Sequence, residues 1–565
     1  MGDVIVEFNV PVRMRDGVAL RTNVYRPSDG RHPVLLTRTP YGKDFPNAGA
    51  PLDPAQVARR GYVVAVQDVR GRFASEGEWG PFVHEACDGV DSIGWAASLP
   101  YGDGRVGTFG GSYVGFTQFA MAAEAMEAVR AITPTFTWGD PFDGQIFRGG
   151  AFELGLGTTW SLLLGLNGVT RRHAADPQRA ALAVAGLVRE FDALARSGYA
   201  SLPLREFAPL FRHGLFDEIR EAIEHPMDRS RAHELDVAAR LERVSAPAFI
   251  VGGWYDIFLK GTLDNYAALR KRGVPAKLLI GPWAHIQYGS RIGEMVFGFA
   301  AQAAFIDLRA DLGSLLVRWF DRWVKGEENG VDREPPVLIF VMGANRWRAE
   351  AEWPPAGMLQ TSYFLRGEGG LSIGRPSAEL PDEYVYDPRD PVPTLGGATL
   401  LAPEFPAGAY DQRPIEARED VLSYTTEPLS RDTDLIGPVR VHLIASSSAP
   451  DTDFVARLVD VHPDGYAQNL TDGIVRARYR DPEHAAPIEP GRPYEFVIDL
   501  WATANRFFAG HRIRLDISSS SFPRWDRNPG TGHPFGADAE LQPARQSIFH
   551  DAEHPSRIVL PVVPA

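Results

Sequence analysis

The chain has 565 residues and a formal net charge of −14, from 58 basic and 72 acidic side chains, with a pI near 5.5. Its hydrophobic fraction of 44% is that of a globular protein and excludes general disorder. The single cysteine, Cys87, excludes an intrachain disulfide and a cysteine-based zinc site. The acidic balance argues against nucleic acid as the main partner, because binding a polyanion requires a basic face.

The N-terminal residues lack the basic and apolar regions of a secretory signal. No apolar run approaches the ~18 residues that cross a bilayer. These features predict a protein that does not associate with membranes and that lies in the cytoplasm. A mature form from which a signal had been removed would show the same pattern.

From about residue 33 to residue 325, short β-rich runs alternate with helical stretches. The strands are expected at residues 34–37, 62–66, 106–109, 248–251 and 277–280, and the helices at residues 85–98, 113–129, 259–271 and 303–324. This alternation is typical of a mostly parallel sheet with helices on both faces.

Two regions break the alternation. Residues 143–244 contain no clear strand, but amphipathic helical stretches at 177–197 and 205–241 predict an inserted helical cap. From residue 335 onward, Pro, Gly and Asp are frequent, and short β runs such as 337–341 predict a β sandwich or jelly roll. The predicted organisation is therefore an α/β core in two parts, a cap and a β domain, at residues 1–142 with 245–334, 143–244, and 335–565.

A serine lies on a tight turn between an expected strand and an expected helix. Gly110 provides the small residue that such a turn requires two positions before Ser112. Val114 stands where the usual G-x-S-x-G pattern has its second glycine, and Gly115 follows it. Alternatively, Ser112 is a turn residue that caps the helix. The nearby glycines of residues 102–107 match G-x-G-x-x-G but precede a strand, so we interpret them as a turn rather than a nucleotide loop.

A serine nucleophile needs a general base and a carboxylate that orients it. Asp256 and His285 each follow an expected strand and are 29 residues apart, about one β-α-β unit. Their order after Ser112 is that of α/β-hydrolases, in which such residues meet at the carboxyl edge of the sheet. Asp256 could instead cap a helix, and His285 could be a packed loop residue. The joint occurrence of three residue types in this order favours a catalytic triad.

Further motifs lie in the segments Thr37-Arg-Thr-Pro-Tyr-Gly-Lys43, Gln67-Asp-Val-Arg-Gly-Arg-Phe-Ala-Ser-Glu-Gly77, Asp103-Gly-Arg-Val-Gly-Thr-Phe-Gly-Gly-Ser-Tyr113, Gly252-Gly-Trp-Tyr-Asp256, Ile280-Gly-Pro-Trp-Ala-His285 and Leu422-Ser-Tyr-Thr-Thr-Glu-Pro-Leu429, and in the stretch around Asp451 to Asp460. Through these segments the chain resembles, over nearly its whole length, the cocaine esterase-like (CocE/NonD) branch of the Xaa-Pro dipeptidyl-peptidase (S15) hydrolases.

The resemblance implies an α/β-hydrolase core, an inserted helical cap and a C-terminal jelly roll. It implies that Ser112 is the nucleophile, His285 the base and Asp256 its orienting acid. It also implies an oxyanion hole formed by the backbone N–H of Tyr113 and the phenol of Tyr41. The alternative for Tyr41 is an aromatic residue that only packs at an interface.

Rough alignment with the family suggests that Trp138, Trp160 and Phe258 form the substrate pocket, although aromatic rings in such regions also occur as plain core. The resemblance implies a serine esterase that acts on small-molecule esters through an acyl-enzyme, without a metal or an organic cofactor. The number of chains in the assembly stays open, with a homodimer as one option.

Two other functions remain open. Relatives include Xaa-Pro dipeptidyl peptidases, α-amino acid ester hydrolases and cephalosporin-type acylases. Aminopeptidase activity requires carboxylates near the site to bind the substrate ammonium; Glu153 and Asp140 are available, but the sequence does not show that they cluster. The more remote alternative is a non-catalytic carbohydrate- or partner-binding protein built on an inert hydrolase scaffold.

Overall fold

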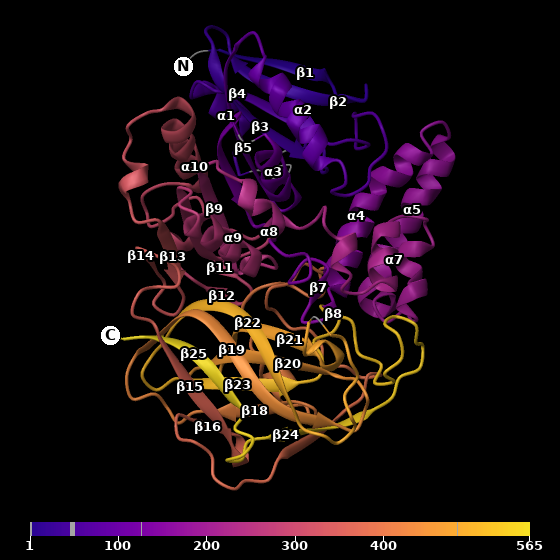
Figure 1. Cartoon of the computed structure of the whole chain (residues 1–565), viewed down its shortest axis with the longest axis vertical. Helices are drawn as coiled ribbons and strands as arrows, with labels where there is room; N and C mark the ends of the chain where they lie inside the picture. The colour runs from indigo at the N-terminus through magenta and orange to yellow at the C-terminus, as the bar shows by residue number, and fades with distance from the viewer. Residues whose placement is uncertain (1–2, 46–50, 126, 483, 565) are drawn as a thin grey trace.

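A computed structural model of the chain describes residues 3–45, 51–125, 127–482 and 484–564. Figure 1 shows an α/β part at one end, a β-rich part at the other end, and a group of helices beside both. Within the described ranges, no helix has the length and apolar content that crossing a membrane requires.

The α/β part is built on a ten-stranded sheet whose central strands are parallel, as the sequence predicts. Antiparallel strands flank the parallel ones at both ends. The central strands are buried along most of their length, which explains why they read as continuous apolar runs. In spatial order the strands are β1 (Val4–Arg13), β2 (Ala19–Pro27), β4 (Val63–Asp68), β3 (His32–Thr39), β5 (Gly102–Gly111), β6 (Val129–Thr135), β9 (Ala248–Tyr255), β10 (Ala276–Ala284), β13 (Val337–Val341) and β14 (Arg346–Glu350).

Residues 337–341, which the sequence predicts as a β run of the C-terminal domain, pair with the first sheet in the structure. This segment is β13, which pairs in parallel with β10 and extends the first sheet, and β14 continues the sheet in the antiparallel direction. The physical reason is that β10, the following helix and β13 form one more strand–helix–strand unit. The two prolines directly before β13 and the frequent Pro and Gly residues after it hide that unit in the residue pattern.

Among the residues that the structure describes, five helices pack against this sheet, and all but α1 lie where the sequence predicts a helix. They are α1 (Pro54–Arg59), α2 (Glu85–Ala97), α3 (Tyr113–Glu124), α9 (Leu259–Lys271) and α10 (Leu312–Phe320), the last of which continues as a π-helical turn (Asp321–Lys325). The helix expected at 303–324 begins only at Leu312, because the carboxylate of Asp311 accepts the backbone N–H of Ser314 and caps it there. The helix expected to reach residue 129 ends at Glu124, because β6 begins at Val129.

The segment between β6 and β9 is mostly helical, and it contributes most of the residues of a separate apolar cluster. Its long helices are α4 (Leu154–Arg172) and α5 (Pro177–Ala193), followed by a π-helical turn (Leu194–Gly198) and by the shorter α6 (Ala208–Phe211), α7 (Asp217–Glu224) and α8 (Val237–Arg240). The continuous helix expected at 205–241 is therefore replaced by short pieces. The sequence analysis also misses a hairpin of two-residue strands, β7 (Phe147–Arg148) and β8 (Ala151–Phe152), which are too short to give a pattern.

A second, eleven-stranded sheet forms the C-terminal β domain, and its pairing is almost entirely antiparallel. Its strands are β15 (Leu359–Arg366), β16 (Gly370–Ser372), β17 (Asp382–Tyr386), β18 (Leu422–Thr425), β19 (Thr433–Ser447), β20 (Asp453–Val461), β21 (Ala467–Arg476), β22 (Tyr494–Phe507), β23 (Arg512–Ser518), β24 (Ala544–Phe549) and β25 (Arg557–Val563). A small hairpin, β11 (Arg291–Ile292) with β12 (Met295–Val296), and the short helix α11 (Arg413–Glu416) complete the elements. The predicted fold class, an α/β core with an inserted helical segment and a C-terminal β domain, is confirmed.

Candidate active site

Ser112 lies in the sharp turn that joins β5 to α3. Its backbone has φ of +59° and ψ of −125°, a combination that residues with side chains rarely adopt. Gly110 has φ of +137°, and a Cβ there would lie 2.2 Å from a methyl carbon of Val114, so this turn requires glycine. The Ser112 side chain makes no capping hydrogen bond to α3. Its hydroxyl is therefore available for another partner.

That partner is His285, which follows β10 at the same edge of the sheet. The distance from His285 Nε2 to Ser112 Oγ is 3.0 Å, and His285 Nδ1 lies 2.7 Å from Asp256 Oδ1. A carboxylate only accepts hydrogen bonds, so the proton sits on Nδ1 and the Nε2 lone pair faces the hydroxyl. The structure thus brings together the three residues that the sequence analysis predicts as a triad, in the geometry required to take a proton from Ser112.

Neighbouring side chains hold the imidazole in place. The Tyr288 hydroxyl donates to the backbone carbonyl of His285 at 2.7 Å, and the Phe258 ring meets the imidazole edge to face at 5.2 Å. The alternative role for Asp256, a helix cap, does not apply: α9 begins at Leu259, and its cap position is Phe258. Tyr288 is a site residue that the sequence analysis misses, because a tyrosine three residues after a histidine carries no recognisable motif.

Tyr41 follows β3, and its hydroxyl interacts with the side chain of Ser112. Burial raises the pKa of Tyr41, while the indole of Trp160, the Ser112 hydroxyl and the backbone N–H of Tyr113 act in the opposite direction through hydrogen bonding. The raised pKa keeps the phenol protonated at neutral pH, so it remains a hydrogen-bond donor. The two donors predicted for the oxyanion hole therefore lie together beside Ser112.

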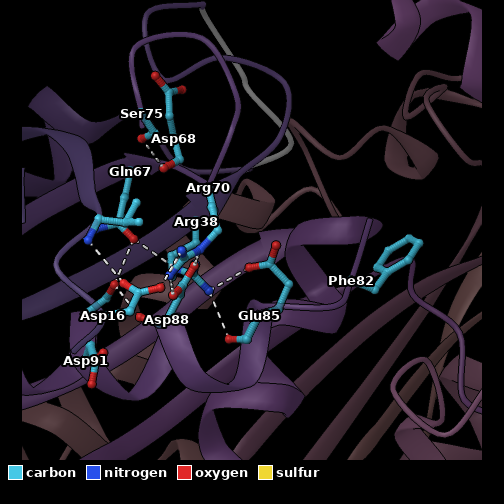
Figure 2. A network of polar contacts seen from close by, with 12 residues as sticks. Asp16, Arg38, Gln67, Asp68, Arg70, Ser75, Phe82, Glu85, Asp88 and Asp91 are labelled. Carbon is cyan, nitrogen blue, oxygen red and sulfur yellow. Dashed lines mark hydrogen bonds and ion pairs between the residues drawn. The ribbon is translucent and has the colours of Figure 1, made fainter. Parts of the chain in front are cut away.

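A buried carboxylate holds the side chain of Tyr113. The Tyr113 hydroxyl donates to Glu85 Oε1 at 2.7 Å and accepts the backbone N–H of Phe82 at 3.0 Å. Glu85 Oε2 in turn accepts from Arg38 Nη1 at 2.7 Å, and Figure 2 shows Glu85 reaching from α2 toward this arginine. Arg38 and Glu85 are 0% and 2% exposed, so this ion pair is shielded from water. The residue after Ser112 is thus anchored to a buried charge pair.

Replacing Glu85 with alanine tests this anchor. Because Glu85→Ala leaves the Arg38 guanidinium buried without its closest carboxylate, we expect a loss of about 3–5 kcal/mol in the free energy of unfolding. Chemical denaturation followed by fluorescence measures it. The matched control is Glu489→Ala, which removes an exposed ion pair with Arg492 and should cost less than about 1 kcal/mol. Equal stability of the two variants would contradict the buried-pair interpretation.

A cavity of about 410 Å³ opens onto Ser112. The three aromatic residues proposed for the pocket, Trp138, Trp160 and Phe258, all line it, together with Tyr113. Because apolar surface dominates the lining, the cavity suits an apolar group attached to the reacting carbonyl.

Phe82 is at the centre of the aromatic cluster that borders this cavity. Its ring stacks on Tyr113 with centroids 4.4 Å apart and on Trp160 at 5.9 Å, and it meets Trp138 edge to face at 5.1 Å. No motif in the sequence marks Phe82 as a site residue. It lies in a loop just before α2, where no periodic pattern separates a pocket residue from ordinary packing.

The acidic residues near the cavity differ from those that the sequence offered. Glu153 accepts from the Trp525 indole at 2.9 Å, Asp140 pairs with Arg229 at 2.8 Å, and neither lines the cavity. The carboxylates that do line it come from the helical segment and are Asp217, Glu218, Glu221, Asp228 and Glu234. Burial and the neighbouring carboxylates raise the pKa of Glu218.

A separate group of side chains in the β domain has the composition of a metal site. Asp460, His462 and His511 offer ligand atoms within 4.8 Å of one another. One Asp460 oxygen, however, already accepts from His511 Nδ1 at 2.8 Å, and the other accepts from the Asn505 amide at 3.0 Å. Both carboxylate oxygens thus have hydrogen-bond donors, and none of these residues lines the cavity.

Comparisons with known proteins agree with this geometry. Residues 16–287 match the model of the X-Pro dipeptidyl-peptidase (S15) family, and residues 329–559 match that of the X-Pro dipeptidyl-peptidase C-terminal non-catalytic domain. The cocaine esterase of Rhodococcus sp. (strain MB1 Bresler) is 39% identical, over 100% of this chain and 99% of that protein.

The chain belongs to the X-Pro dipeptidyl-peptidase (S15) family. Solved structures of similar architecture include an α-amino acid ester hydrolase, with 27% identity and a TM-score of 0.81 over 99% of this chain and 97% of that one. An aminopeptidase from a marine sediment Thaumarchaeota archaeon has 25% identity and the same TM-score over 100% and 97% of the two chains. The chain is therefore a hydrolase of the serine class, and its resemblance to the cocaine esterase-like branch is confirmed.

Proposed function

We propose that this chain hydrolyses carboxylic esters of small molecules through an acyl-enzyme formed on Ser112. The observation that carries the proposal is the contact of Ser112 Oγ with His285 Nε2 at 3.0 Å, next to the 2.7 Å contact of His285 with Asp256. The 39% identical relative is a cocaine esterase, and this supports ester hydrolysis as the reaction.

In the acylation step, His285 Nε2 takes the Ser112 proton while Oγ attacks the ester carbonyl carbon. The carbonyl oxygen becomes an oxyanion, which accepts hydrogen bonds from the Tyr113 backbone N–H and the Tyr41 phenol. The bond to the alkoxy oxygen then breaks, and the alcohol leaves with the proton from the imidazolium.

Deacylation repeats these steps with water. His285 takes a proton from a water molecule that attacks the acyl carbon, and the same donors hold the second oxyanion. Collapse of that intermediate releases the carboxylic acid and returns the proton to Ser112. Asp256 keeps the proton of His285 on Nδ1 throughout and stabilises the imidazolium.

Removing the nucleophile tests the proposal directly. We expect Ser112→Ala to lose ester hydrolysis and labelling by a fluorophosphonate probe, because no other group can form the acyl-enzyme, while circular dichroism shows a folded protein. Ser161→Ala is the matched control, since Ser161 is fully buried in α4 but does not line the cavity. Wild-type turnover by Ser112→Ala would remove Ser112 from the mechanism, and a wild-type protein that the probe leaves unlabelled would favour an inert scaffold.

The phenol of Tyr41 has its own test. Because one fixed donor to an oxyanion contributes a factor of about 10²–10³, Tyr41→Phe should lower kcat by this factor with little change in KM. Steady-state kinetics with an aryl ester measure both values. Tyr25→Phe, on β2 away from the cavity, is the control. Activity near that of the wild type would return Tyr41 to a packing role.

A second candidate is hydrolysis of substrates that carry a free amino group. The carboxylates along the cavity, which include Glu218 with its raised pKa, favour it because an ammonium group would relieve their mutual repulsion. Parallel assays with an N-acylated ester, the matching α-amino ester and an Xaa-Pro anilide separate the candidates. We expect turnover of the N-acylated ester; turnover confined to the amino substrates would replace the esterase by this second candidate.

Three expectations from the sequence stay predictions: a cytoplasmic location, the lack of a nucleic-acid partner, and the homodimer as one option. The net charge of −14 supports the second of these. The domain boundaries also stay predictions.

A further inference from the structure

Arg72 is a buried cation in the turn that follows β4. It belongs to the Asp68-Val-Arg-Gly-Arg72 segment, which carries the family resemblance but has no role in the mechanism above. Its side chain is 1% exposed and lies over the ring of Trp79, with 4.4 Å between Cζ and the centroid. In the described part of the chain, no carboxylate lies within 4.0 Å of its guanidinium.

Neighbouring arginines show how unusual this is. Arg38 lies on β3 and Arg70 lies two residues before Arg72. Each of these two guanidinium groups has a carboxylate oxygen within 2.7 Å (Figure 2). Burying a guanidinium without a counter-ion is unfavourable unless other polar groups stabilise the charge. Around Arg72 these groups are backbone carbonyls and the phenol of Tyr41.

The guanidinium joins the two segments that form the oxyanion side of the site. Nε donates to the carbonyl of Pro40, directly before Tyr41, at 2.9 Å. Nη1 donates to the carbonyl of Leu164, one helical turn after Trp160 in α4, also at 2.9 Å. The Trp160 indole in turn points at the Tyr41 hydroxyl, with 3.5 Å between the heavy atoms. Arg72 therefore holds both Tyr41 and the helix that contacts it.

The charge of Arg72 also acts on this site. Burial lowers the pKa of Arg72 to about 10, so the side chain is still a cation at neutral pH. Its charge favours the negative form of the Tyr41 phenol and so counters part of the effect of burial on the pKa of Tyr41. A positive charge that is felt at this phenol is also felt by an oxyanion bound to it, because the interior screens charges weakly.

We propose that Arg72 is a positioning residue for the oxyanion hole, which holds Tyr41 against Ser112 through the Pro40 carbonyl and adds a positive charge behind the two donors. The proposal rests on the proposed esterase function. It assigns to Arg72 the task of aligning a donor that acts mainly in the transition state, so kcat rather than KM depends on it.

The test compares Arg72→Gln with Arg171→Gln. Arg171 is the matched control because its guanidinium donates to the carbonyl of Phe73, in the same turn, but not to the segment that carries Tyr41. With an aryl ester, and with active sites counted by fluorophosphonate titration, we expect Arg72→Gln to lower kcat about 10- to 100-fold with KM changed less than about 3-fold. Arg171→Gln should keep kcat within about 3-fold of the wild type.

Two further measurements separate positioning from general support of the fold. The affinity for a trifluoromethyl ketone, whose adduct with serine carries an oxyanion, should fall in Arg72→Gln by about the same factor as kcat/KM. In the Tyr41→Phe background, Arg72→Gln should lower kcat much less than it does alone, because the donor it positions is already gone. Equal effects in both backgrounds, or an unchanged affinity for the ketone, would overturn the proposal.

Arg72→Lys covers the case in which Arg72→Gln does not fold. It keeps the charge but cannot reach both carbonyls with the planar geometry of a guanidinium, so we expect a smaller loss of kcat of about 3- to 10-fold. A kcat equal to that of Arg171→Gln would overturn the inference. If the wild type itself does not turn over esters, the proposed function fails instead, so the two failures are distinguishable.

Discussion

The backbone of Ser112 is held at a positive φ that a residue with a side chain adopts only at an expense of about 1–3 kcal/mol. The surrounding structure imposes this conformation. Gly110 lets the turn pass close to Val114, and the Ser112 N–H donates to the carbonyl of Thr135 on the neighbouring strand at 2.9 Å. Because the turn cannot relax into a regular helix start, Oγ stays directed at His285 and the N–H of Tyr113 stays free of the helix. The positions of the proposed nucleophile and of one proposed oxyanion donor both depend on this strained turn.

Buried charges around the turn fall into two kinds. In the pair of Arg38 with Glu85, the two opposite charges lie in direct contact. Glu85 also supports the site, because it accepts a hydrogen bond from the Tyr113 hydroxyl. Arg72 donates its hydrogen bonds to carbonyl oxygens, and among the described residues no carboxylate lies within 4.0 Å of its guanidinium, so its positive charge has no paired anion. The Arg38–Glu85 pair rigidifies the site and leaves little net electrostatic field. Arg72 leaves a positive electrostatic potential on the side where negative charge develops. A preorganised field of this kind needs no reorganisation when the reaction occurs.

The sequence predicts the core of this site well, because each triad residue follows a buried strand of a parallel sheet. Such strands give clear apolar runs, and their carboxyl ends meet at one edge, so Ser112, Asp256 and His285 could be placed together without coordinates. The apolar pattern does not identify β13 as a seventh parallel strand of this sheet, because two prolines precede it and the sequence after it is rich in Gly. It also fails for Phe82, whose position depends on the path of a loop. Periodicity describes regular elements and says little about the segments between them.

The walls of the cavity illustrate the consequence for specificity. Ser112 and Phe258 belong to the core, Trp160 and the carboxylates from 217 onward belong to the helical segment, and Leu400 comes from the C-terminal side of the chain. The proposed reacting groups therefore lie at the ends of regular strands, which the sequence pattern predicts. Most of the cavity wall that would contact the remainder of a substrate comes from helices and loops. Ser112, Asp256 and His285 all come from the core, so the parts of the helical segment that do not contact Tyr41 can vary in sequence without moving them. It follows that the class of reaction can be inferred from strand ends, while the choice among esters depends on packing between segments distant in sequence.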